Sequence, residues 1–304
     1  MELTVFPDPP SFERAARDFL AAHEAENNLL IGMTATLIER PDAYGESPPY
    51  LAIVRGDAGQ VALAALRTPP HNLVVSAATD PSALSALAAD VKSRTPSLPG
   101  VLGPAATARA FAEVWERATG EGPAAERAER IYELTAVIPP RPAPGRLVRA
   151  TEADRELLID WMDRFNVEAH GHSDRRRAHA GVEHRLASRT GGLYLWVDGE
   201  PACIAGAAGP TATGIRIGPV YTPPDRRRRG YGSSCVAALS QALLDSGRQR
   251  CFLFTDLANP TSNAIYQAIG YRPVCDMAEI EIGRPPPPPI MPPPPIMPPS
   301  PSRG

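Results

Sequence analysis

A short segment rich in glycine and arginine separates two stretches with different secondary-structure preferences. Residues 215–221 favour a β-strand, which Pro223 and Pro224 end because proline has no backbone N–H to donate to a neighbouring strand. Four arginines and two glycines follow, and residues 231–244 have the amphipathic pattern of an α-helix. A strand that leads through such a loop into a helix directs backbone N–H groups at a phosphate. The segment therefore predicts a phosphate-binding loop.

The spacing within this loop sharpens the prediction. Gly230 and Gly232 let a ligand approach the backbone because neither residue has a Cβ atom. The helix that starts beside them offers unpaired N–H donors and the positive end of its dipole. Residues 226–229 could instead be a solvated basic run or a nucleic-acid patch. We favour the phosphate loop, because four arginines in a chain with a formal net charge of −3 neutralise too few phosphates for nucleic-acid binding.

The pattern Arg227-x-x-Gly230-x-Gly232 resembles the acetyl-CoA loop of the GCN5-related N-acetyltransferase (GNAT) superfamily, which reads Arg/Gln-x-x-Gly-x-Gly/Ala. Downstream, residues 259–273 read Asn-Pro-Thr-Ser-Asn-Ala-Ile-Tyr-Gln-Ala-Ile-Gly-Tyr-Arg-Pro. They are similar to the superfamily's Asn…Asn-x-x-x-x-Tyr…Gly-Phe/Tyr signature, with one position shifted. Two matches in the right order are more specific than either alone. The resemblance covers the C-terminal half, residues 146–283.

The resemblance implies an α/β (α+β) fold, with a mixed, mostly antiparallel, splayed sheet flanked by helices. The hydrophobic pattern of residues 146–283 gives the order strand, two helices, three strands, helix, strand, helix, strand. Residues 1–138 give the same order and end in an alternating strand at 131–137. We therefore expect two units in tandem. Residues 139–145, Pro-Pro-Arg-Pro-Ala-Pro-Gly, are expected to form an extended linker between them.

The N-terminal unit lacks the loop of glycines and arginines. After its third strand, residues 74–82 read Val-Val-Ser-Ala-Ala-Thr-Asp-Pro-Ser. If residues 1–138 form a second GNAT-like domain, we expect that domain to be degenerate and to have lost cofactor binding. The alternative is another kind of α/β domain that shapes the substrate side of the site.

In the resembled enzymes acetyl-CoA lies in a splayed gap between two neighbouring strands, and its pantetheine arm pairs with one of them. Residues 214–222 are the matching strand, and Gly218-Pro219 is consistent with a bulge that starts the gap, since both residues disrupt regular pairing. The pyrophosphate is expected on the N–H groups of residues 228–233. The resemblance implies these cofactor-binding residues: Val220, Thr222, Arg227, Arg228, Arg229, Gly230, Tyr231, Gly232, Ser233, Asn259 and Asn263.

Acetyl transfer to an amine needs a donor that polarises the thioester carbonyl, an acid for the departing thiolate and a base for the amine. The backbone N–H of Val220 or its neighbour is the candidate donor. Tyr266 matches the family's acid position, and its structural alternative is a core aromatic on an amphipathic helix. Asn259 is expected to bind the pantetheine amide, to cap the helix that starts at Pro260, or to do both.

The base is harder to assign. Many relatives carry a glutamate on the cofactor strand, but residues 215–221 contain no carboxylate. The nearest candidates lie in residues 168–174, Glu-Ala-His-Gly-His-Ser-Asp, a region that borders the acceptor cleft in the superfamily. Glu168, His170, His172 or Asp174 could relay a proton through water. We take Glu168 as the candidate base and expect Asp174 to cap the next helix. Four of the six histidines lie between His170 and His184, but their spacing fits no zinc pattern, so no metal is expected.

The composition and the sequence patterns limit the cellular location and the partners that we expect. No apolar run is long enough to cross a bilayer, the N-terminus has no signal-peptide pattern, and the four cysteines show no CxxC spacing. We expect a cytoplasmic protein with buried thiols that binds neither membrane nor nucleic acid. Of the 36 prolines, 12 lie in residues 285–304. The proline-rich tail, residues 284–304, is expected to be disordered or, alternatively, to bind weakly to a partner with an SH3-like groove.

These features predict an N-acetyltransferase that moves an acetyl group from acetyl-CoA to a primary amine by direct attack in a ternary complex. The tandem arrangement favours a small-molecule acceptor bound between the two halves over a protein. The alternative is a non-catalytic acyl-CoA sensor or scaffold, and the missing strand carboxylate is the feature that supports it.

Overall fold

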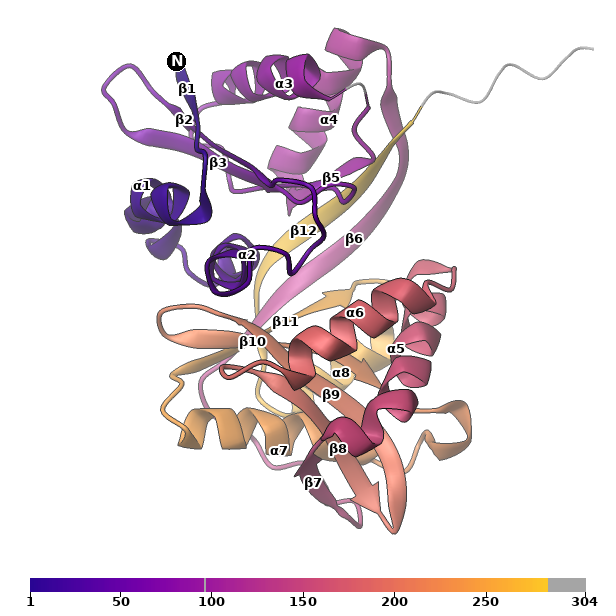
Figure 1. Ribbon diagram of the computed structural model, residues 1–304. Helices are drawn as coiled ribbons and strands as arrows, with labels where there is room; N and C mark the ends of the chain where they lie inside the picture. The colour runs from indigo at the N-terminus through magenta and orange to yellow at the C-terminus, as the bar shows by residue number, and fades with distance from the viewer. Residues whose placement is uncertain (96, 284–304) are drawn as a thin grey trace, which may run out of the picture.

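The computed structural model describes residues 1–95 and 97–283, and every strand of this part belongs to one sheet (Figure 1). The strands lie in the order β1-β2-β3-β4-β5-β12-β6-β11-β10-β9-β8-β7. The N-terminal half contains β1 (Glu2–Val5), α1 (Pro9–Ala21), α2 (Asn28–Glu39), β2 (Tyr50–Arg55), β3 (Val61–Arg67), β4 (Leu73–Val75), α3 (Ser82–Arg94), β5 (Gly100–Pro104), α4 (Ala105–Thr119) and β6 (Gly122–Leu134). The C-terminal half contains β7 (Arg146–Arg149), η1 (Glu152–Asp154), α5 (Arg155–His170), α6 (Arg175–Leu186), β8 (Gly192–Asp198), β9 (Glu200–Pro210), β10 (Gly214–Tyr221), η2 (Pro224–Arg226), α7 (Tyr231–Asp245), β11 (Arg250–Asp256), α8 (Pro260–Ala268) and β12 (Arg272–Gly283).

The two halves repeat the same order of strands and α-helices, which confirms the predicted tandem arrangement. Within the described residues the β4–β5 and β10–β11 pairs are parallel and the other strand pairs are antiparallel, so the sheet is mixed and mostly antiparallel as expected. None of the described helices is long and apolar enough to span a bilayer. The predicted proline-rich tail lies outside the described residues.

Helices cover both faces of the sheet in each half, because the strands are apolar on both sides. In the N-terminal half α1 and α2 pack on Leu51 and Leu66, while α3 and α4 pack on Leu63 and Val101. In the C-terminal half α5 and α6 pack on one face, and α7 and α8 pack on the other. The chain therefore forms three layers, helices–sheet–helices, in both halves.

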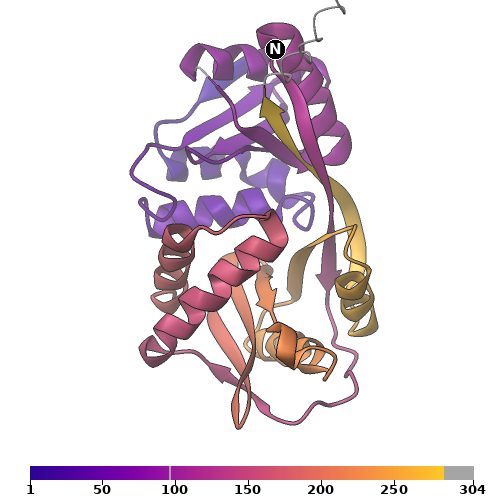
Figure 2. The same cartoon turned by 90° about the vertical axis from the view of Figure 1, so that its right-hand side faces the viewer.

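The long strands β6 and β12 join the halves. They have 13 and 12 residues, pair with each other antiparallel, and run along one side of the molecule from one half to the other (Figure 2). β12 also pairs with β5, whereas β6 pairs with β11. Ile280 of β12 is thus buried in the N-terminal core, and Tyr132 of β6 is buried in the C-terminal core. Each of the sequence repeats predicted at 1–138 and 146–283 therefore depends on the other for a central strand.

The strand expected at 131–137 begins nine residues earlier, at Gly122, and ends at Leu134. The boundary was wrong because residues 122–130 are mostly small or charged and show no apolar alternation. They form a strand because β12 pairs along their whole length. An ion pair between Arg130 Nε and Asp276 Oδ1, 2.5 Å apart, links the two strands, and a second joins Arg127 to Glu279.

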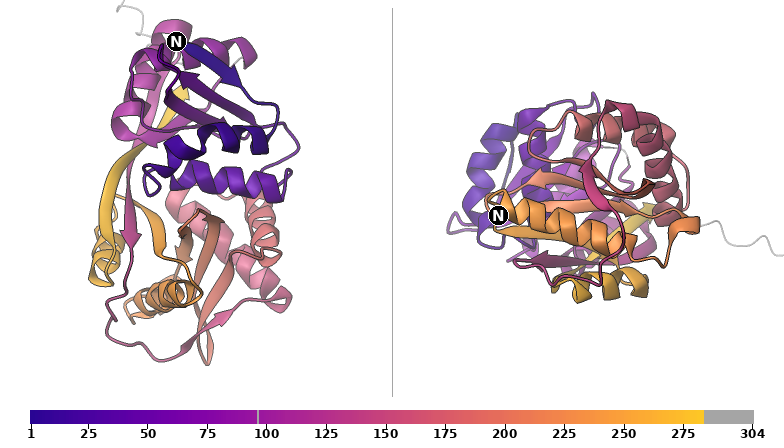
Figure 3. Two further views of the ribbon diagram at one scale, coloured as in Figure 1. Left: turned by 90° about the vertical axis from the view of Figure 1, so that its left-hand side faces the viewer. Right: turned by 90° about the horizontal axis from the view of Figure 1, so that it is seen from below.

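The halves also touch directly, where α2 packs against β9 (Figure 3). Gly32 of α2 meets Gly209 so closely that a Cβ atom on Gly32 would lie 2.8 Å from the Gly209 Cα. Nearby, the Glu24 carboxylate accepts hydrogen bonds from the Thr213 backbone N–H (2.8 Å) and hydroxyl (2.6 Å). These contacts close one side of a cleft that lies between the halves.

Candidate active site

β10 and β11 pair at one end and separate at the other. They are paired only over residues 214–216 and 250–252. A register shift between Ile217 and Val220 marks a bulge that contains Gly218 and Pro219, as predicted. Beyond this bulge, the edge of β10 that faces β11 has no strand partner among the described residues. The structure therefore contains the expected splayed gap.

The bulge also changes which face of the sheet the end of β10 presents. Ile217 packs in the core beneath α7 and α8, whereas Tyr221 packs in the core beneath α5 and α6. Residues four apart on a regular strand share a face of the sheet. Because the bulge adds one residue to β10, Ile217 and Tyr221 instead point to opposite faces. Tyr221 meets Trp161 of α5 edge to face, with ring centroids 6.2 Å apart.

The predicted phosphate loop enters α7 without a side-chain cap. Gly230, the N-cap residue, has φ = 81°, a conformation that costs glycine little. The bond from the Ser234 N–H to the Gly230 carbonyl, 3.0 Å, is the first of the helical ladder, so the N–H groups of residues 231–233 lie before it at the open helix start. A Cβ on Gly232 would meet only Thr222 Oγ1, 3.5 Å away. This open cradle fits a pyrophosphate.

The arginines of the loop have different surroundings. Arg227 Nη2 donates to both Glu168 oxygens (2.6 and 2.7 Å), and its Nε donates to the Thr222 carbonyl (2.8 Å). Arg227 therefore holds the loop against the end of α5. Arg228 and Arg229 are exposed and form no ion pair with any described carboxylate. Their charges remain available at the helix start.

The remaining loop residues are held from outside the gap. Tyr231 donates a 2.6 Å hydrogen bond to Asp198 at the end of β8. Ser234 accepts one from the Ala143 N–H in the predicted linker (3.1 Å). Val220, Thr222 and Ser233 line the cleft, as do Gly230, Tyr231 and Gly232.

The two asparagines of the downstream signature differ in position. Asn259 lines the cleft and caps α8, because its side chain accepts from the Ser262 N–H at 3.0 Å. Asn263 does not reach the cleft. Its side chain donates to the carbonyls of Asp256 and Asn259 and accepts from the Tyr132 hydroxyl. Asn263 thus fastens α8 to β11 and β6.

Tyr266 of α8 is both a core aromatic residue and a residue that lines the cleft, so both interpretations of its sequence position agree with its surroundings. It is 9% exposed, packs edge to face against Tyr271 with centroids 6.0 Å apart, and belongs to the core beneath α7 and α8. It also lines the cleft. Burial raises the pKa of its hydroxyl, so the phenol keeps its proton at neutral pH.

In the N-terminal half, the segment between β4 and α3 corresponds to the phosphate loop, and its contacts differ from those of that loop. The Asp80 carboxylate accepts from the Ser82 N–H (2.9 Å) and hydroxyl (2.7 Å) at the start of α3. The Ala78 N–H, in the loop after β4, donates to Thr107 of α4 (3.2 Å). A carboxylate thus lies where the C-terminal half has glycines and arginines, and a negative group there disfavours phosphate.

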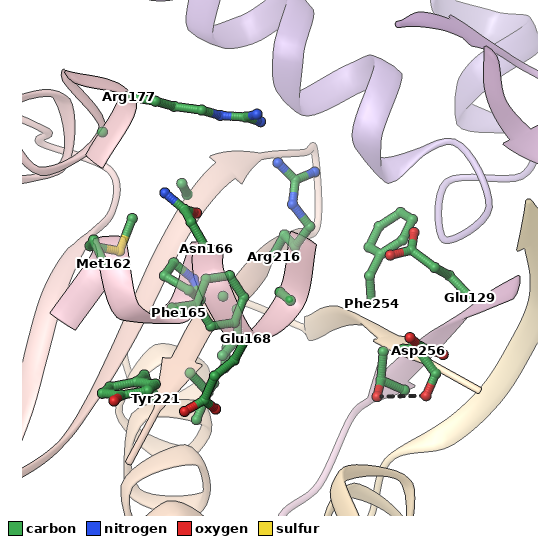
Figure 4. A pocket seen from close by; sticks show the side chains of 18 of the residues that line it. Glu129, Met162, Phe165, Asn166, Glu168, Arg177, Arg216, Tyr221, Phe254 and Asp256 are labelled. Atoms are coloured by element: carbon green, nitrogen blue, oxygen red, sulfur yellow. Dashed lines mark hydrogen bonds between the residues drawn. The ribbon is translucent and has the colours of Figure 1, made fainter. Parts of the chain in front are cut away.

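The gap opens into a cleft of about 2100 Å³ lined by both halves (Figure 4). α5 and α6 contribute one wall, which includes Phe165, Asn166 and Arg177. The opposite wall contains Phe254 and Glu129. The cleft beside the gap is therefore lined by side chains that lie far apart in the sequence.

Glu129 is a site residue that the sequence prediction missed. It lies opposite Asp256, while Ile131, two residues along β6, lies opposite Phe254. Residues two apart share a face, so Glu129 and Phe254 enter the cleft from the same side of the sheet. Tyr132 points the other way, toward α8. Extending the predicted strand by two residues would have placed Glu129 on this face.

Burial raises the pKa of Glu129 to about 7. The negative charges of Glu279 and Asp256 contribute to this increase in pKa, and the positive charge of Arg127 opposes it. A carboxyl group with such a pKa can accept a proton near neutral pH. Glu168, the base predicted from the sequence, also lines the cleft, but its carboxylate is bound to Arg227.

The segment between α5 and α6 is arranged by its own hydrogen bonds. Asp174 caps α6 as predicted, since its side chain accepts from the Arg177 N–H at 2.9 Å. His170 ends α5, and its side chain is not described. No cluster of three or more potential metal ligands occurs in the described residues. Of the cysteines, Cys203, Cys235 and Cys251 are buried free thiols, and Cys275 is half-buried.

Comparison with known proteins agrees with this geometry. The family model described as FR47-like protein matches residues 204–278, which run from β9 to β12. No curated protein sequence matches the chain.

Three solved structures resemble nearly the whole chain. A protein from Drosophila is 16% identical, with a TM-score of 0.67 over 93% of this chain and 98% of that one. A GCN5-related N-acetyltransferase from Sphaerobacter thermophilus is 17% identical, with a TM-score of 0.58 over 93% and 96%. A tandem GNAT protein from the clavulanic acid biosynthesis pathway is 13% identical, with a TM-score of 0.55 over 93% and 98%. The likeness to GCN5-related N-acetyltransferases is thus confirmed, and the chain has the GNAT fold in tandem.

Proposed function

We propose that the protein is an acetyl-CoA-dependent N-acetyltransferase whose C-terminal half binds the acetyl donor. The observation that carries the proposal is the splayed gap between β10 and β11, which leads to the uncapped start of α7. The open space at Gly232 and the unpaired charges of Arg228 and Arg229 suit a pyrophosphate. When bound there, acetyl-CoA supplies an activated acetyl thioester.

Different residues around the gap are assigned to different parts of acetyl-CoA. The N–H groups of residues 231–233 hold the pyrophosphate, with Arg228 and Arg229 adding charge. The free edge of β10 at Val220 and Thr222 pairs with the extended pantetheine arm, and Asn259 lies at the other side of the gap. The backbone N–H of Val220 polarises the thioester carbonyl. Asn263 supports this site by fixing α8, because its side chain is bonded to the carbonyls of Asp256 and Asn259 and to the Tyr132 hydroxyl.

Proton transfer is assigned to two residues on opposite faces of the sheet. Tyr266, from the α8 side, donates its phenolic proton to the departing sulfur. Glu129, from the cleft side, removes a proton from the acceptor amine, directly or through water. With a pKa of about 7, Glu129 is mostly ionised at slightly alkaline pH and can then accept a proton. Glu129 lies on β6 and offers a base in place of the carboxylate that β10 lacks, so the lack of a carboxylate on β10 no longer favours a non-catalytic sensor.

Glu168 has a different role in this proposal. Because it binds Arg227 through two hydrogen bonds, it positions the phosphate loop rather than the amine. The acceptor is a small primary amine, since the cleft lies between both halves and its walls come from α2, α5, α6 and the sheet. The N-terminal half shapes this cleft and binds no donor of its own, because Asp80 occupies the start of α3.

A thiol-release assay tests the proposal. Acetyl-CoA is incubated with the protein and a panel of primary amines, and free thiol and acetylated product are measured. Acceptor-dependent thiol release with a matching amount of N-acetylated product is expected. Tight binding of acetyl-CoA without release for any amine would instead indicate a sensor.

A further inference from the structure

Two arginines of the cleft lack the partners that a desolvated guanidinium normally has. Arg185 lies on α6 and Arg216 on β10, and both line the cleft. Neither forms an ion pair with the described part of the chain. Charged groups out of water are normally paired, because losing hydration is costly.

The contacts of these arginines satisfy few of their donors. Arg185 Nη1 donates to the Gly181 carbonyl at 3.2 Å, while its buried Nε has no hydrogen-bond partner among the described residues. Arg216 Nη1 makes a long contact of 3.4 Å to Asn28 Oδ1, and its guanidinium lies 6.0 Å from the centre of the Phe254 ring. A guanidinium carries five N–H donors, so most remain available to a ligand.

The two guanidiniums converge on one region. Each interacts electrostatically with Tyr44 from the N-terminal half, and the charge of Arg216 acts on Arg185. Burial lowers the pKa of both, that of Arg185 to about 10, and the neighbouring charge of Arg177 acts in the same direction on Arg185. Figure 4 shows Arg177 and Arg216 directed into the same part of the cleft from α6 and β10.

Across Phe254 from Arg216, the cleft is acidic. Glu129 lies beside Phe254 (Figure 4), and the carboxylates of Glu279 and Asp256 add negative charge near it. The cleft thus presents a cationic region and an acidic region on either side of one aromatic ring. A zwitterionic ligand complements this distribution, with its ammonium toward Glu129 and its anionic group toward the arginines.

We propose that Arg185 and Arg216 bind a carboxylate of the acceptor, so that the substrate is an amino acid or a similar amino carboxylate. The inference rests on the proposed function, because it places the amine of the same molecule at Glu129. A carboxylate supplies two acceptor oxygens that guanidinium forks bind in a planar geometry. It also compensates two half-buried charges that the described protein leaves unpaired.

Matched acceptor pairs test this proposal. Each amino acid is compared with the amine that lacks only its carboxylate: glycine with methylamine, alanine with ethylamine, and phenylalanine with phenethylamine. For at least one pair, we expect kcat/KM to be about tenfold or more higher for the amino acid, because a charge-assisted bidentate contact is lost in the amine. Equal kcat/KM values within every pair would overturn the proposal while leaving the transferase function intact.

Variants of the two arginines provide a second test of the proposed carboxylate site. R216Q and R185Q are expected to remove the preference for the amino acid while changing turnover of the plain amine little. R216K keeps the charge but not the fork and should retain part of the preference. R175Q is the matched control, because Arg175 is an exposed residue of the same helix as Arg185. An unchanged preference in R216Q and R185Q would contradict the assignment.

A binding measurement separates this proposal from the proposed function. Propionate has a carboxylate but no amine, and it should raise the melting temperature of the wild type but not of R216Q. This result without thiol release from any amine would support the carboxylate site and reject the transferase. Thiol release with plain amines, and no stabilisation by propionate, would do the reverse.

Discussion

Glu129 and Asp256 lie opposite each other on β6 and β11, so a carboxylate from the N-terminal half stands beside the donor gap of the C-terminal half. If Glu129 is the base, it must be ionised to work. Because its pKa is raised to about 7, kcat/KM should rise as the pH increases through about 7 and level off above it.

E129Q is expected to abolish this rise and to lower kcat by about 10²-fold or more, the usual contribution of a general base. The pH profile of acceptor-dependent thiol release is the measurement. E126Q is the control, because Glu126 lies on the same strand but pairs with Arg109. A wild-type pH profile in E129Q would remove Glu129 from the mechanism.

Tyr266→Phe tests the acid. The substitution keeps the aromatic packing against Tyr271 but removes the hydroxyl, so kcat should fall about tenfold or more while the Kd for acetyl-CoA stays nearly constant. Tyr271→Phe is the matched control. It loses a buried hydrogen bond to Ser240 (2.9 Å), which should cost about 1 kcal/mol of unfolding free energy without a comparable loss of kcat. Equal turnover in Tyr266→Phe and the wild type would exclude the acid role.

Glu168→Gln distinguishes loop positioning from base catalysis. With Arg227 released, we expect KM for acetyl-CoA to rise several-fold and kcat to change little. Arg227→Gln should produce the same pattern, because each variant removes the same ion pair. A large fall in kcat, confined to Glu168→Gln and accompanied by an altered pH profile, would restore Glu168 as the base.

Gly32→Ala tests the contact between the halves. Alanine in a helix normally stabilises by about 1 kcal/mol relative to glycine. Here its Cβ would lie 2.8 Å from the Gly209 Cα, so we expect a lower free energy of unfolding instead. Gly181→Ala in α6 is the control, because the nearest atoms are the ends of the Arg185 and Met162 side chains. Chemical denaturation measures both, and a more stable Gly32→Ala variant would show that the halves are not held in close contact there.

The sequence predicted the parts of the site that depend on local chemistry. The loop around Gly230, the bulge at Gly218-Pro219 and the caps at Asn259 and Asp174 follow from backbone requirements of single residues or pairs. The repeated order of strands and helices could also be predicted, because strands and helices differ in the spacing of their hydrophobic residues.

The features that depend on long-range pairing were not predictable in this way. Residues 122–130 become a strand only because β12 pairs with them, and no apolar alternation marks them beforehand. Glu129 was therefore missed. The partners of Arg227, and the lack of an ion-pair partner for Arg216 within residues 1–95 and 97–283, likewise depend on helices that pack against the sheet from distant parts of the chain.

The donor site is tested most directly by calorimetric titration of acetyl-CoA into the wild type and Gly232→Phe. A phenylalanine there would fill the space beside Thr222 at the start of α7, so acetyl-CoA affinity should fall at least about tenfold. Ala242→Phe places the same side chain on the exposed face of α7 and should bind normally. Wild-type affinity in Gly232→Phe, or no binding of acetyl-CoA to the wild type, would contradict the assignment of this gap as the donor site.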